Sequence, residues 1–465
     1  MGAAKRNAST TDSRWDLAVV GGGAAGLAAA RAAVARGART LLVSAGPLGG
    51  DCTHTGCVPS KALIEAAGRG ASFDAAMAGV SAAVTTIAAT ETAEVLASEG
   101  IAVRFGRARL APGGLTIDGE HVAARRIVLA TGSVPAIPPI AGLAEVAYLT
   151  NETVFSLQAP PGALAVIGGG PIGCELAQAF ARLGVRVTLI EATSRLLPAE
   201  VPEASEIISR RLGADGVTVR LSATVARATR SGGIARLVLA DDTAMEVTHI
   251  LVATGRRPAT EGLGLAESGV AVGPGGHIVT DARLRTSRRE IYAAGDVTGV
   301  MPFTHVADEM GRVAAENALS RRPRRRLHLG SIPSVTFTDP EVARVGVSAA
   351  NAPGERVAYL PMSEVDRAIV AGHTDGFVSL IARRRRLVGN LGGGRLVGAT
   401  IVAPRAGEMI HEPALAIRTG MFAGRLAQTV HAYPTWSVAI RMAAAQFVTT
   451  VNGRTVRPAE SSHDA

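Results

Sequence analysis

Two glycine-rich loops constrain the fold of this chain more than any other feature of its sequence. The first occupies residues 21–26 and the second residues 168–173, 147 positions further on. Each loop follows a short apolar segment typical of a strand and precedes a run that predicts a helix. One such loop is a weak signal, but two in the same setting predict two βαβ units, each able to bind a dinucleotide. The expected strands are 15–20, 41–43, 164–167 and 185–190, and the expected helices are 27–35 and 174–183.

The glycines of each loop have separate tasks. The first allows a tight turn, the second lets the backbone approach a pyrophosphate, and the third lets helix and strand pack closely. The helix N-terminus then faces the phosphate charge. We therefore expect dinucleotide contacts at Gly21, Gly23 and Gly26 in the first loop and at Gly168, Gly170 and Gly173 in the second.

The two units differ at the position where an acidic residue normally accepts hydrogen bonds from a ribose. Glu191 lies 18 residues beyond Gly173, whereas the same offset from Gly26 leads to Ser44. A carboxylate at 191 favours NADH over NADPH because it repels a 2′-phosphate, although Arg195 nearby favours the opposite choice. Ser44 can make a hydrogen bond but carries no charge, so the first site must hold its nucleotide mainly through other contacts.

The cysteines indicate redox or metal chemistry. The chain has three, and two of them, Cys52 and Cys57, lie five positions apart after the first βαβ unit. We expect no metal site, because the pair offers two of the roughly four ligands that a structural zinc needs and His54 adds at most a third. His54 is expected either to line the pocket or to make a hydrogen bond just before the helix. Cys174 is expected to be a small packing residue.

The segment that carries the pair predicts a helix beginning at Cys57, with Pro59 in its first turn. The helix dipole at that end lowers a thiol pKa and favours the thiolate. Lys61 stands out because the only other lysine is at position 5, while arginine supplies the remaining cations. We interpret Lys61 as a compact point charge that the site requires.

Length and composition bound the class of protein. At 465 residues the chain predicts about three domains, and its 47% apolar content lies within the globular range. No apolar run reaches the roughly 18 residues of a membrane span, and the first dozen residues lack a signal core. We therefore expect a soluble cytoplasmic protein with no membrane partner. The net charge of +9 is interpreted as surface charge rather than nucleic-acid binding, because no aromatic platform accompanies the arginine runs.

From about residue 16 to residue 451 the chain resembles the flavoprotein disulfide reductases, the family of dihydrolipoamide dehydrogenase, glutathione reductase and mercuric reductase. The run 50–61 is similar to the redox-active disulfide of that family, and 291–296 is similar to its second flavin motif. Further similarities are the paired domain-crossing segments at 130–132 and 253–258, the start of the dimerisation domain at 337–346, and two stretches of the mercuric-reductase-like branch at 149–153 and 366–368.

The resemblance implies an α/β fold with two Rossmann-like dinucleotide-binding domains and a C-terminal α+β dimerisation domain. It implies FAD in the first site, a nicotinamide nucleotide in the second, and a homodimer in which the C-terminal domain of one subunit completes the active site of the other. We predict an FAD-binding domain at 15–150 and 280–328, an NAD(P)-binding domain at 151–279, a dimerisation domain at 329–452, a disordered tail at 1–14 and a second tail at 453–465.

The resemblance also implies roles for single residues. Nicotinamide hydride goes to the flavin, whose electrons open a Cys52–Cys57 disulfide, and a bridge across so short a loop is expected to be reducible. Cys57 faces the flavin and Cys52 attacks the substrate. Lys61 lies by the flavin N5 and pairs with Glu175, where a cation favours the reduced flavin.

Other implied contacts surround the flavin and the nicotinamide nucleotide. A helix expected from Thr304 to about Leu319 aims its N-terminus at the flavin pyrimidine ring, and His305 either contacts the flavin or has a capping role. Asp296 binds the ribityl chain. The remaining expected flavin contacts are Ser44, Gly50, Asp51, Thr131, Gly132 and Ala307, and the nicotinamide nucleotide is expected to contact Glu191 and Gly255.

The chain departs from the family near its C-terminus. Disulfide-reducing members carry a histidine–glutamate dyad that protonates the leaving thiol, but here Tyr433 and Val438 occupy those two positions. Tyrosine has a pKa of about 10 and is a poor base near neutral pH. Mercuric reductase has a tyrosine here as well, yet it adds a C-terminal cysteine pair that this sequence does not contain. His431 is a second candidate acid, with a structural role as its alternative.

The leading hypothesis is an FAD-dependent NAD(P)H oxidoreductase that works through the cysteine pair on a small disulfide, metal thiolate or other acceptor. One alternative is a diaphorase that reduces quinones or metals directly from the flavin, with the disulfide incidental. Another is a redox-sensing or complex-anchoring flavoprotein with little turnover.

Overall fold

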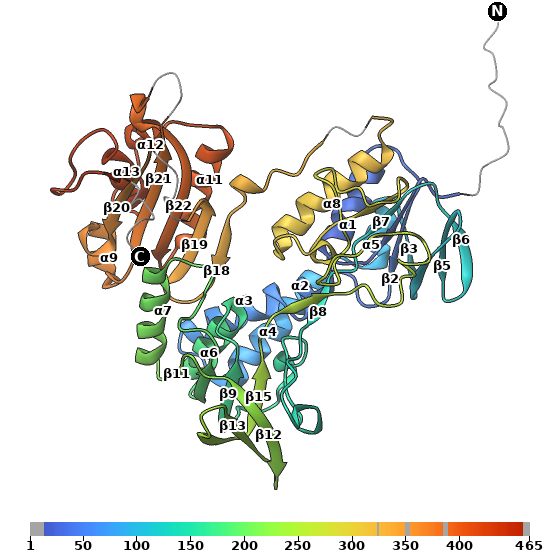
Figure 1. Ribbon diagram of the computed structural model, residues 1–465, viewed down its shortest axis with the longest axis horizontal. Coiled ribbons are helices and arrows are strands. Elements are labelled where there is room, and N and C mark those ends of the chain that lie inside the picture. The colour runs from blue at the N-terminus through green and yellow to red at the C-terminus, as the bar shows by residue number, and fades with distance from the viewer. Residues whose placement is uncertain (1–13, 323–324, 349–353, 385–388, 459–465) are drawn as a thin grey trace, which may run out of the picture. The chain divides into compact units, whose positions relative to one another are not determined.

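The computed structural model describes residues 14–322, 325–348, 354–384 and 389–458 (Figure 1). The predicted tail at 1–14 therefore lies almost wholly outside the described residues, as does the end of the second tail at 459–465. The chain divides into two compact units. The first comprises 1–59, 82–135 and 256–327, and the second comprises 60–81, 136–255 and 328–465.

The first unit is built on a five-stranded parallel sheet in the order β17-β7-β1-β2-β3. Two helices, α1 and α8, lie side by side against it (Figure 1). They approach closely because Gly311 of α8 has no side chain, and a Cβ there would meet the carbonyl oxygen of Ala25 in α1. The bounds are β1 Leu17–Val20, α1 Ala24–Val34, β2 Thr40–Ser44, β3 Ile101–Phe105, β7 Ile127–Leu129, β17 Ile291–Ala293 and α8 Thr304–Leu319.

Smaller elements complete the first unit. The cysteine segment forms α2 (Gly50–His54) and the start of α3 (Cys57–Gly68). An antiparallel meander of three strands lies between β3 and β7 in the chain. The domain-crossing segments pair as β8 (Ser133–Pro135) with β16 (Arg256–Pro258). Leu263 and Ile278 pack in the core of this unit, although our predicted NAD(P)-binding domain extends to 279. The meander strands are β4 Ala108–Ala111, β5 Gly114–Ile117 and β6 Glu120–Ala123.

The second unit repeats the βαβ arrangement in a four-stranded parallel sheet of order β11-β10-β9-β15. Alternate faces of its strands are buried in two clusters, one against α6 and one against the meander β12-β13-β14. The bounds are β9 Ala163–Ile167, α6 Pro171–Arg182, β10 Arg186–Ile190, α7 Pro202–Ala214, β11 Thr218–Arg220, β12 Val225–Ser231, β13 Ile234–Leu239, β14 Ala244–Val247 and β15 His249–Val252.

The second unit also holds a six-stranded antiparallel sheet in the order β18-β19-β22-β21-β20-β23, packed with helices α10 to α13. The last strand pairs with β20, so residues 457–458 of the predicted second tail add to the sheet edge. The strands are β18 Ser334–Thr336, β19 Glu341–Gly346, β20 Glu355–Pro361, β21 Phe377–Arg383, β22 Arg395–Ala403 and β23 Arg457–Pro458. The helices are α9 Asp366–Ala371, α10 Ala406–Met409, α11 His411–Arg418, α12 Ala423–Gln428 and α13 Val438–Ala445.

This architecture confirms the predicted α/β fold, but two helix starts were predicted too late. The helix expected from residue 27 begins at Ala24, and the one expected from residue 174 begins at Pro171. The third glycine of each loop, Gly26 or Gly173, therefore lies within the first turn, where a Cβ would meet the carbonyl oxygen of the first glycine. The predicted helix from Thr304 to Leu319 is confirmed as α8.

One apolar stretch, Phe73–Ser98, has the length and hydropathy that could cross a membrane, which by itself is a weak signal. It is divided into α4 (Phe73–Ala88) and α5 (Ala93–Ser98), and the side chain of Thr92 caps α5 by accepting a hydrogen bond from Val95 N. The 16 residues of α4 span about 24 Å, which is shorter than a bilayer core of about 30 Å.

Candidate functional site

The first glycine loop follows β1, and at several of its positions there is no room for any side chain larger than that of glycine. Gly21 has φ of 116°, and a Cβ there would meet the carbonyl oxygen of Ala130. Gly23 is the N-cap residue of α1 and has no side-chain cap, so the amides of the first turn remain available to an anion. Gly50 has φ of 61°, and its backbone lies so close to Gly23 that a Cβ would meet Gly23 Cα. This cradle fits a pyrophosphate.

The residue at the end of β2 offers no charge to a nucleotide. Ser44 is buried, and its hydroxyl donates to the carbonyl oxygen of Gly46 at 2.8 Å. Its side chain also fills the space next to Gly22. Ser44 therefore packs against the glycine loop, whereas the corresponding residue of the second unit is a carboxylate.

A partly buried network of an ion pair and hydrogen bonds joins the crossing segments to α2, which carries Cys52. Arg256 contacts Asp51 of α2 at 3.1 Å and donates from Nε to Ser133 Oγ at 2.8 Å. Ser133 in turn donates to Asp296 Oδ2 at 2.6 Å. Thr131 ties the same segment to the carbonyl oxygen of Ala259 at 2.7 Å. The sequence motifs located these segments, but they contained no signal for the hub at Arg256.

The remaining predicted flavin contacts lie on the same unit. Gly132 has φ of 71° and open space around it. Ala307 is buried in α8, where its methyl group packs against Gly295, the residue before Asp296. Gly295 therefore lets Ala307, in the first turn of α8, lie close to the segment that carries Asp296.

Cys52 and Cys57 line one cavity of about 850 Å³ between α1 and the start of α8. Both cysteines are free thiols, and Cys57 Sγ lies 3.2 Å from Thr304 Oγ1. His305 lines the same cavity and stacks on Phe303 with ring centroids 5.6 Å apart. The other lining residues are Ala24, Leu27, Ala28, Arg31, Ala32, Glu91, Asp308 and Arg312.

The Cys52 thiol ionises less readily than an ordinary cysteine. The hydrogen bond to Cys57 raises the pKa of Cys52 well above its usual range, and burial adds to the rise. In this arrangement Cys52 keeps its proton near neutral pH. Of the alternatives expected for His54, the structure shows the hydrogen bond before the helix, with Nε2 at 2.8 Å from the carbonyl oxygen of Leu48. Cys174 is fully buried in the core of the second unit, as expected.

In the second unit, Lys61 and Glu175 form an ion pair of 2.8 Å between Nζ and Oε2. The Glu175 side chain is only 6% exposed, and its other oxygen accepts from Phe337 N at 2.8 Å. Lys61 Nζ also lies 4.4 Å from the centroid of the Phe337 ring. The family resemblance implied the ion pair, but nothing in the sequence predicted the contact between Lys61 and the Phe337 ring.

The second glycine loop matches the first in detail. Gly168 has φ of 111°, a Cβ at Gly168 would meet the carbonyl oxygen of Ala253, and Gly170 is the N-cap residue of α6. Glu191 is 9% exposed and accepts from Gly169 N at 2.6 Å and from Thr193 N at 2.7 Å. The backbone therefore fixes this carboxylate beside the loop. Gly255, with φ of 128°, has open space around it.

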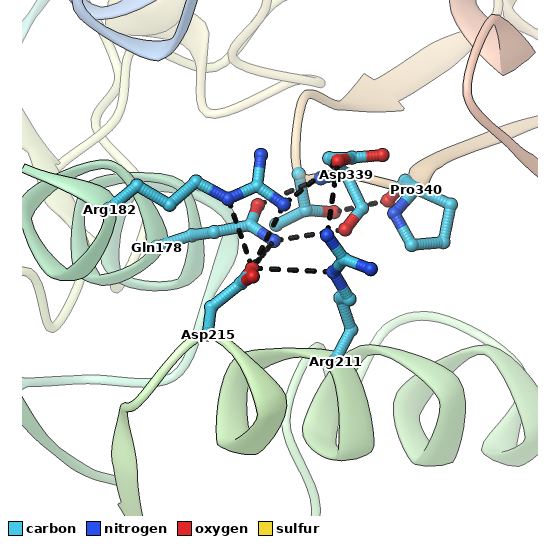
Figure 2. Close-up of polar contacts among 7 residues, drawn as sticks. Gln178, Arg182, Arg211, Asp215, Asp339 and Pro340 are labelled. Carbon is cyan, nitrogen blue, oxygen red and sulfur yellow. Dashed lines mark hydrogen bonds and ion pairs between the residues drawn. The ribbon is translucent and has the colours of Figure 1, made fainter. Parts of the chain in front are cut away.

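A second charged cluster lies where α6 and α7 meet the segment before β19. Figure 2 shows Arg182 and Arg211 between the carboxylates of Asp215 and Asp339. Arg182 Nη2 lies 2.9 Å from Asp215 and 2.8 Å from Asp339, whereas Arg211 makes longer contacts of 3.4 and 3.6 Å. Gln178 donates to the carbonyl oxygen of Asp339 and accepts from its amide. Nothing in the sequence predicted this cluster.

The residues at the departure from the family lie in the second unit. Tyr433 is 72% exposed and donates to Asp366 Oδ2 at 2.7 Å, which raises the pKa of its phenol. His431 has a buried side chain, with Nδ1 at 3.0 Å from the carbonyl oxygen of Thr429 and Nε2 at 3.1 Å from Glu412. Val438 packs in the core of the antiparallel sheet.

Metal-binding geometry is not found among the parts of the chain that the structure describes. In residues 14–322, 325–348, 354–384 and 389–458, no group of three or more histidine, cysteine, aspartate or glutamate side chains could hold a metal ion.

Comparison with known proteins gives agreeing results. Residues 15–311 match the family described as pyridine nucleotide-disulphide oxidoreductase, and residues 332–444 match its dimerisation domain. The chain is 39% identical to a mercuric reductase of Streptomyces lividans, with 94% of this chain and 97% of that protein covered. It is 33% identical to a dihydrolipoyl dehydrogenase of Chlamydia trachomatis, covering 90% and 94%.

A solved structure agrees as well. The Cu(II) complex of the HOCl-induced flavoprotein disulfide reductase RclA from Escherichia coli superposes with a TM-score of 0.85 at 27% identity, covering 93% of this chain and 99% of that one.

Proposed function

Because this chain belongs to the pyridine nucleotide-disulphide oxidoreductase family, we propose that it moves electrons from NAD(P)H to the Cys52–Cys57 pair and on to a small acceptor. The acceptor is a small disulfide, a metal thiolate or another small oxidant. FAD, when bound, supplies the two-electron step between nicotinamide and thiols. The observation that carries the proposal is the cysteine pair in a cavity that begins at the first glycine loop.

The residues of the first unit fit FAD. The cradle at Gly21, Gly23 and Gly50 accepts a pyrophosphate against the N-terminus of α1. Asp296 is held by Ser133 for hydrogen bonds to a ribityl chain. The N-terminus of α8 carries Thr304 and His305 to the cavity that holds the cysteines. These contacts are supported by geometry and by the family match.

The cysteine pair divides the chemistry between two sulfurs. With a disulfide acceptor, the Cys52 sulfur attacks one substrate sulfur, the substrate S–S bond breaks, and the proton that Cys52 loses ends on the leaving sulfur, which departs as a thiol. Cys57 then attacks Cys52, which releases the second substrate thiolate and oxidises the pair. The Thr304 hydroxyl, 3.2 Å from Cys57, stabilises the thiolate that begins this second attack.

Proton transfer at the substrate is assigned to Tyr433. The dimerisation domain supports a homodimer, and we place Tyr433 of the partner subunit next to the cysteine cavity. The hydrogen bond to Asp366 keeps this phenol protonated and oriented at neutral pH. His431 is assigned a structural role, because both of its ring nitrogens are already engaged by Thr429 and Glu412.

The nucleotide preference is assigned to Glu191. Two backbone amides hold its carboxylate beside the second loop, where a 2′-phosphate would be repelled. Arg195 donates to the carbonyl oxygen of Pro198 at 2.8 Å, so its guanidinium is engaged elsewhere. NADH is therefore the expected electron donor. We further infer a cytoplasmic location, because a chain with three free thiols suits a reducing compartment.

Anaerobic titration of the purified protein with NADH tests the proposal. The bound FAD and the cysteine pair should together give a long-wavelength thiolate–flavin absorbance at two electrons per subunit, absent in Cys57→Ser and weaker per mole of NADPH than of NADH. The same band in Cys57→Ser would disprove the sulfur assignment.

A diaphorase that works without the disulfide is the second candidate, favoured by Val438 in place of the dyad carboxylate. A screen of disulfides, quinones and Hg(II), read by flavin reoxidation, separates the two. Turnover that survives the Cys52→Ser, Cys57→Ser double substitution would favour the diaphorase.

A further inference from the structure

The ammonium group of Lys61 lies over an aromatic ring as well as beside a carboxylate. Its Nζ is 4.4 Å from the centroid of the Phe337 ring and 2.8 Å from Glu175 Oε2. A cation within about 6 Å of a ring centroid is attracted by the negative face of the ring. The Lys61 side chain is 33% exposed. The ring and the carboxylate therefore restrict the position of the Lys61 ammonium group, which would otherwise be able to move toward the solvent.

Glu175 fixes both partners of this contact. One carboxylate oxygen accepts from Lys61, and the other accepts from the backbone amide of Phe337 at 2.8 Å. Because the carboxylate is 6% exposed, its two bonds are protected from competing water. The position of the Phe337 backbone relative to Lys61 is thus set by a single buried side chain.

The residues after Phe337 are held by the same helix. Gln178 accepts from Asp339 N at 2.8 Å and donates to Asp339 O at 2.9 Å, and Arg182 pairs with the Asp339 carboxylate (Figure 2). Glu175, Gln178 and Arg182 are spaced three and four residues apart, so they share one face of α6. Helix α6 therefore contacts the segment 337–339 through three side chains. The position of Phe337 is thus fixed independently of any movement of the Lys61 side chain.

We propose that Phe337 is a positioning residue whose ring holds the Lys61 ammonium where it favours flavin reduction. The inference rests on the proposed function, together with the family resemblance, which implies that Lys61 lies by the flavin. Phe337 acts through Lys61 and contacts no substrate. Its removal should leave the ion pair with Glu175 intact but let the ammonium group move toward water, which weakens the stabilisation of negative charge on the reduced flavin.

The test measures the two-electron equilibrium of the flavin against a reference dye in the Cys52→Ser, Cys57→Ser background, where the flavin alone takes up electrons. Phe337→Leu keeps an apolar side chain but removes the ring face. A cation–π contact at a partly exposed site corresponds to about a two- to fivefold factor in an equilibrium constant. We expect flavin reduction to become about fivefold less favourable, which is about 20 mV at 29.6 mV per tenfold change. Phe337→Tyr, which keeps a ring face, should restore the original value.

A double-mutant comparison separates positioning from a structural effect. In a Lys61→Met background, Phe337→Leu should not change the flavin equilibrium any further, because the ring has no cation to hold. Trp15→Leu is the matched control, since it removes a ring 4.4 Å from Arg39 in the first unit and should leave the equilibrium unchanged. An unaltered potential in Phe337→Leu, or the same decrease with and without Lys61, would overturn the proposal.

One further variant and one further measurement allow the positioning role to be tested even if Phe337→Leu does not fold. If Phe337→Leu does not fold, trifluorophenylalanine at the same position weakens the ring face without changing its shape, and the same loss is expected. FAD content is measured for each protein. A wild-type chain that binds no FAD would disprove the proposed function itself, whereas an FAD-loaded protein whose equilibrium ignores Phe337 would disprove the positioning role alone.

Discussion

Replacing Thr304 by valine removes the hydroxyl group that lies 3.2 Å from Cys57 Sγ and keeps a β-branched side chain of similar shape. In the proposed mechanism this hydroxyl donates to a Cys57 thiolate in the reduced enzyme. A hydrogen bond to a charged group contributes about 1.5–3 kcal/mol. Since Cys57 is exposed in the cavity, the lower value of about 1.5 kcal/mol applies. At 1.36 kcal/mol per pH unit, the first ionisation of the cysteine pair should move upward by about one pH unit.

The assay is the rate of iodoacetamide alkylation of the reduced protein as a function of pH, with the modified cysteine identified by mass spectrometry. Only the thiolate reacts, so the midpoint of the rate profile reports the first ionisation of the coupled pair. Thr304→Ser keeps the hydroxyl and should titrate like wild type.

Two outcomes would refute this reasoning. A Thr304→Val profile within about 0.3 pH unit of wild type, against the shift of about one expected from the lost bond, would show that the hydroxyl does not stabilise the thiolate. A Thr304→Ser variant that shifts as far as Thr304→Val would show that packing at the start of α8, rather than the hydrogen bond, controls ionisation.

Three further predictions address stability and proton transfer. Burial raises the pKa of Glu341 to about 7, so its folded-state pKa lies above its unfolded value, and wild-type stability relative to Glu341→Gln should fall by up to about 3 kcal/mol as pH rises from about 4.5 to 7; urea unfolding at pH 5 and pH 8 measures the difference, and a constant difference contradicts it. Arg182→Met leaves Arg211, with its longer contacts, as the remaining cation beside Asp215 and Asp339 and should lower the free energy of unfolding by about 2 kcal/mol, against less than about 1 for Arg211→Met in the same urea assay; equal losses would refute the ranking. Tyr433→Phe should slow turnover of disulfide acceptors by at least about tenfold while the anaerobic rate of enzyme reduction by NADH stays unchanged; loss of both rates would argue against a role confined to the substrate thiol.

Much of the fold could be predicted because its signals are local. The loops at 21–26 and 168–173 need positive φ and contact distances that only glycine tolerates, so their pattern survives in the sequence regardless of what packs around them. The helix expected from Thr304 to about Leu319 is confirmed as α8. The starts of α1 and α6 were predicted too late, because Gly26 and Gly173 look like loop residues until the packing of the first turn is known.

The site was predicted less completely, because several of its partners come from distant segments. The pair of Lys61 with Glu175 was expected from the family, but the Phe337 ring depends on a loop 162 residues beyond Glu175. Asp366, whose carboxylate accepts a hydrogen bond from the Tyr433 hydroxyl, lies 67 residues earlier, at the start of α9. No periodicity or spacing connects such residues, since their contact depends on how whole elements pack.

The sequence by itself determined the two dinucleotide units, the cysteine pair at the start of a helix and the absence of the histidine–glutamate dyad of the family. Each of these features depends on a few residues close together in the sequence, and their backbone conformation or side-chain chemistry allows few alternatives. Only the tertiary structure decided what surrounds those features: the Thr304 hydroxyl at Cys57, the Arg256 hub between Asp51 and Ser133, and the carboxylate that Asp366 brings to Tyr433. These contacts form when segments distant in the sequence bury their apolar faces against each other, so no local sequence pattern predicts them.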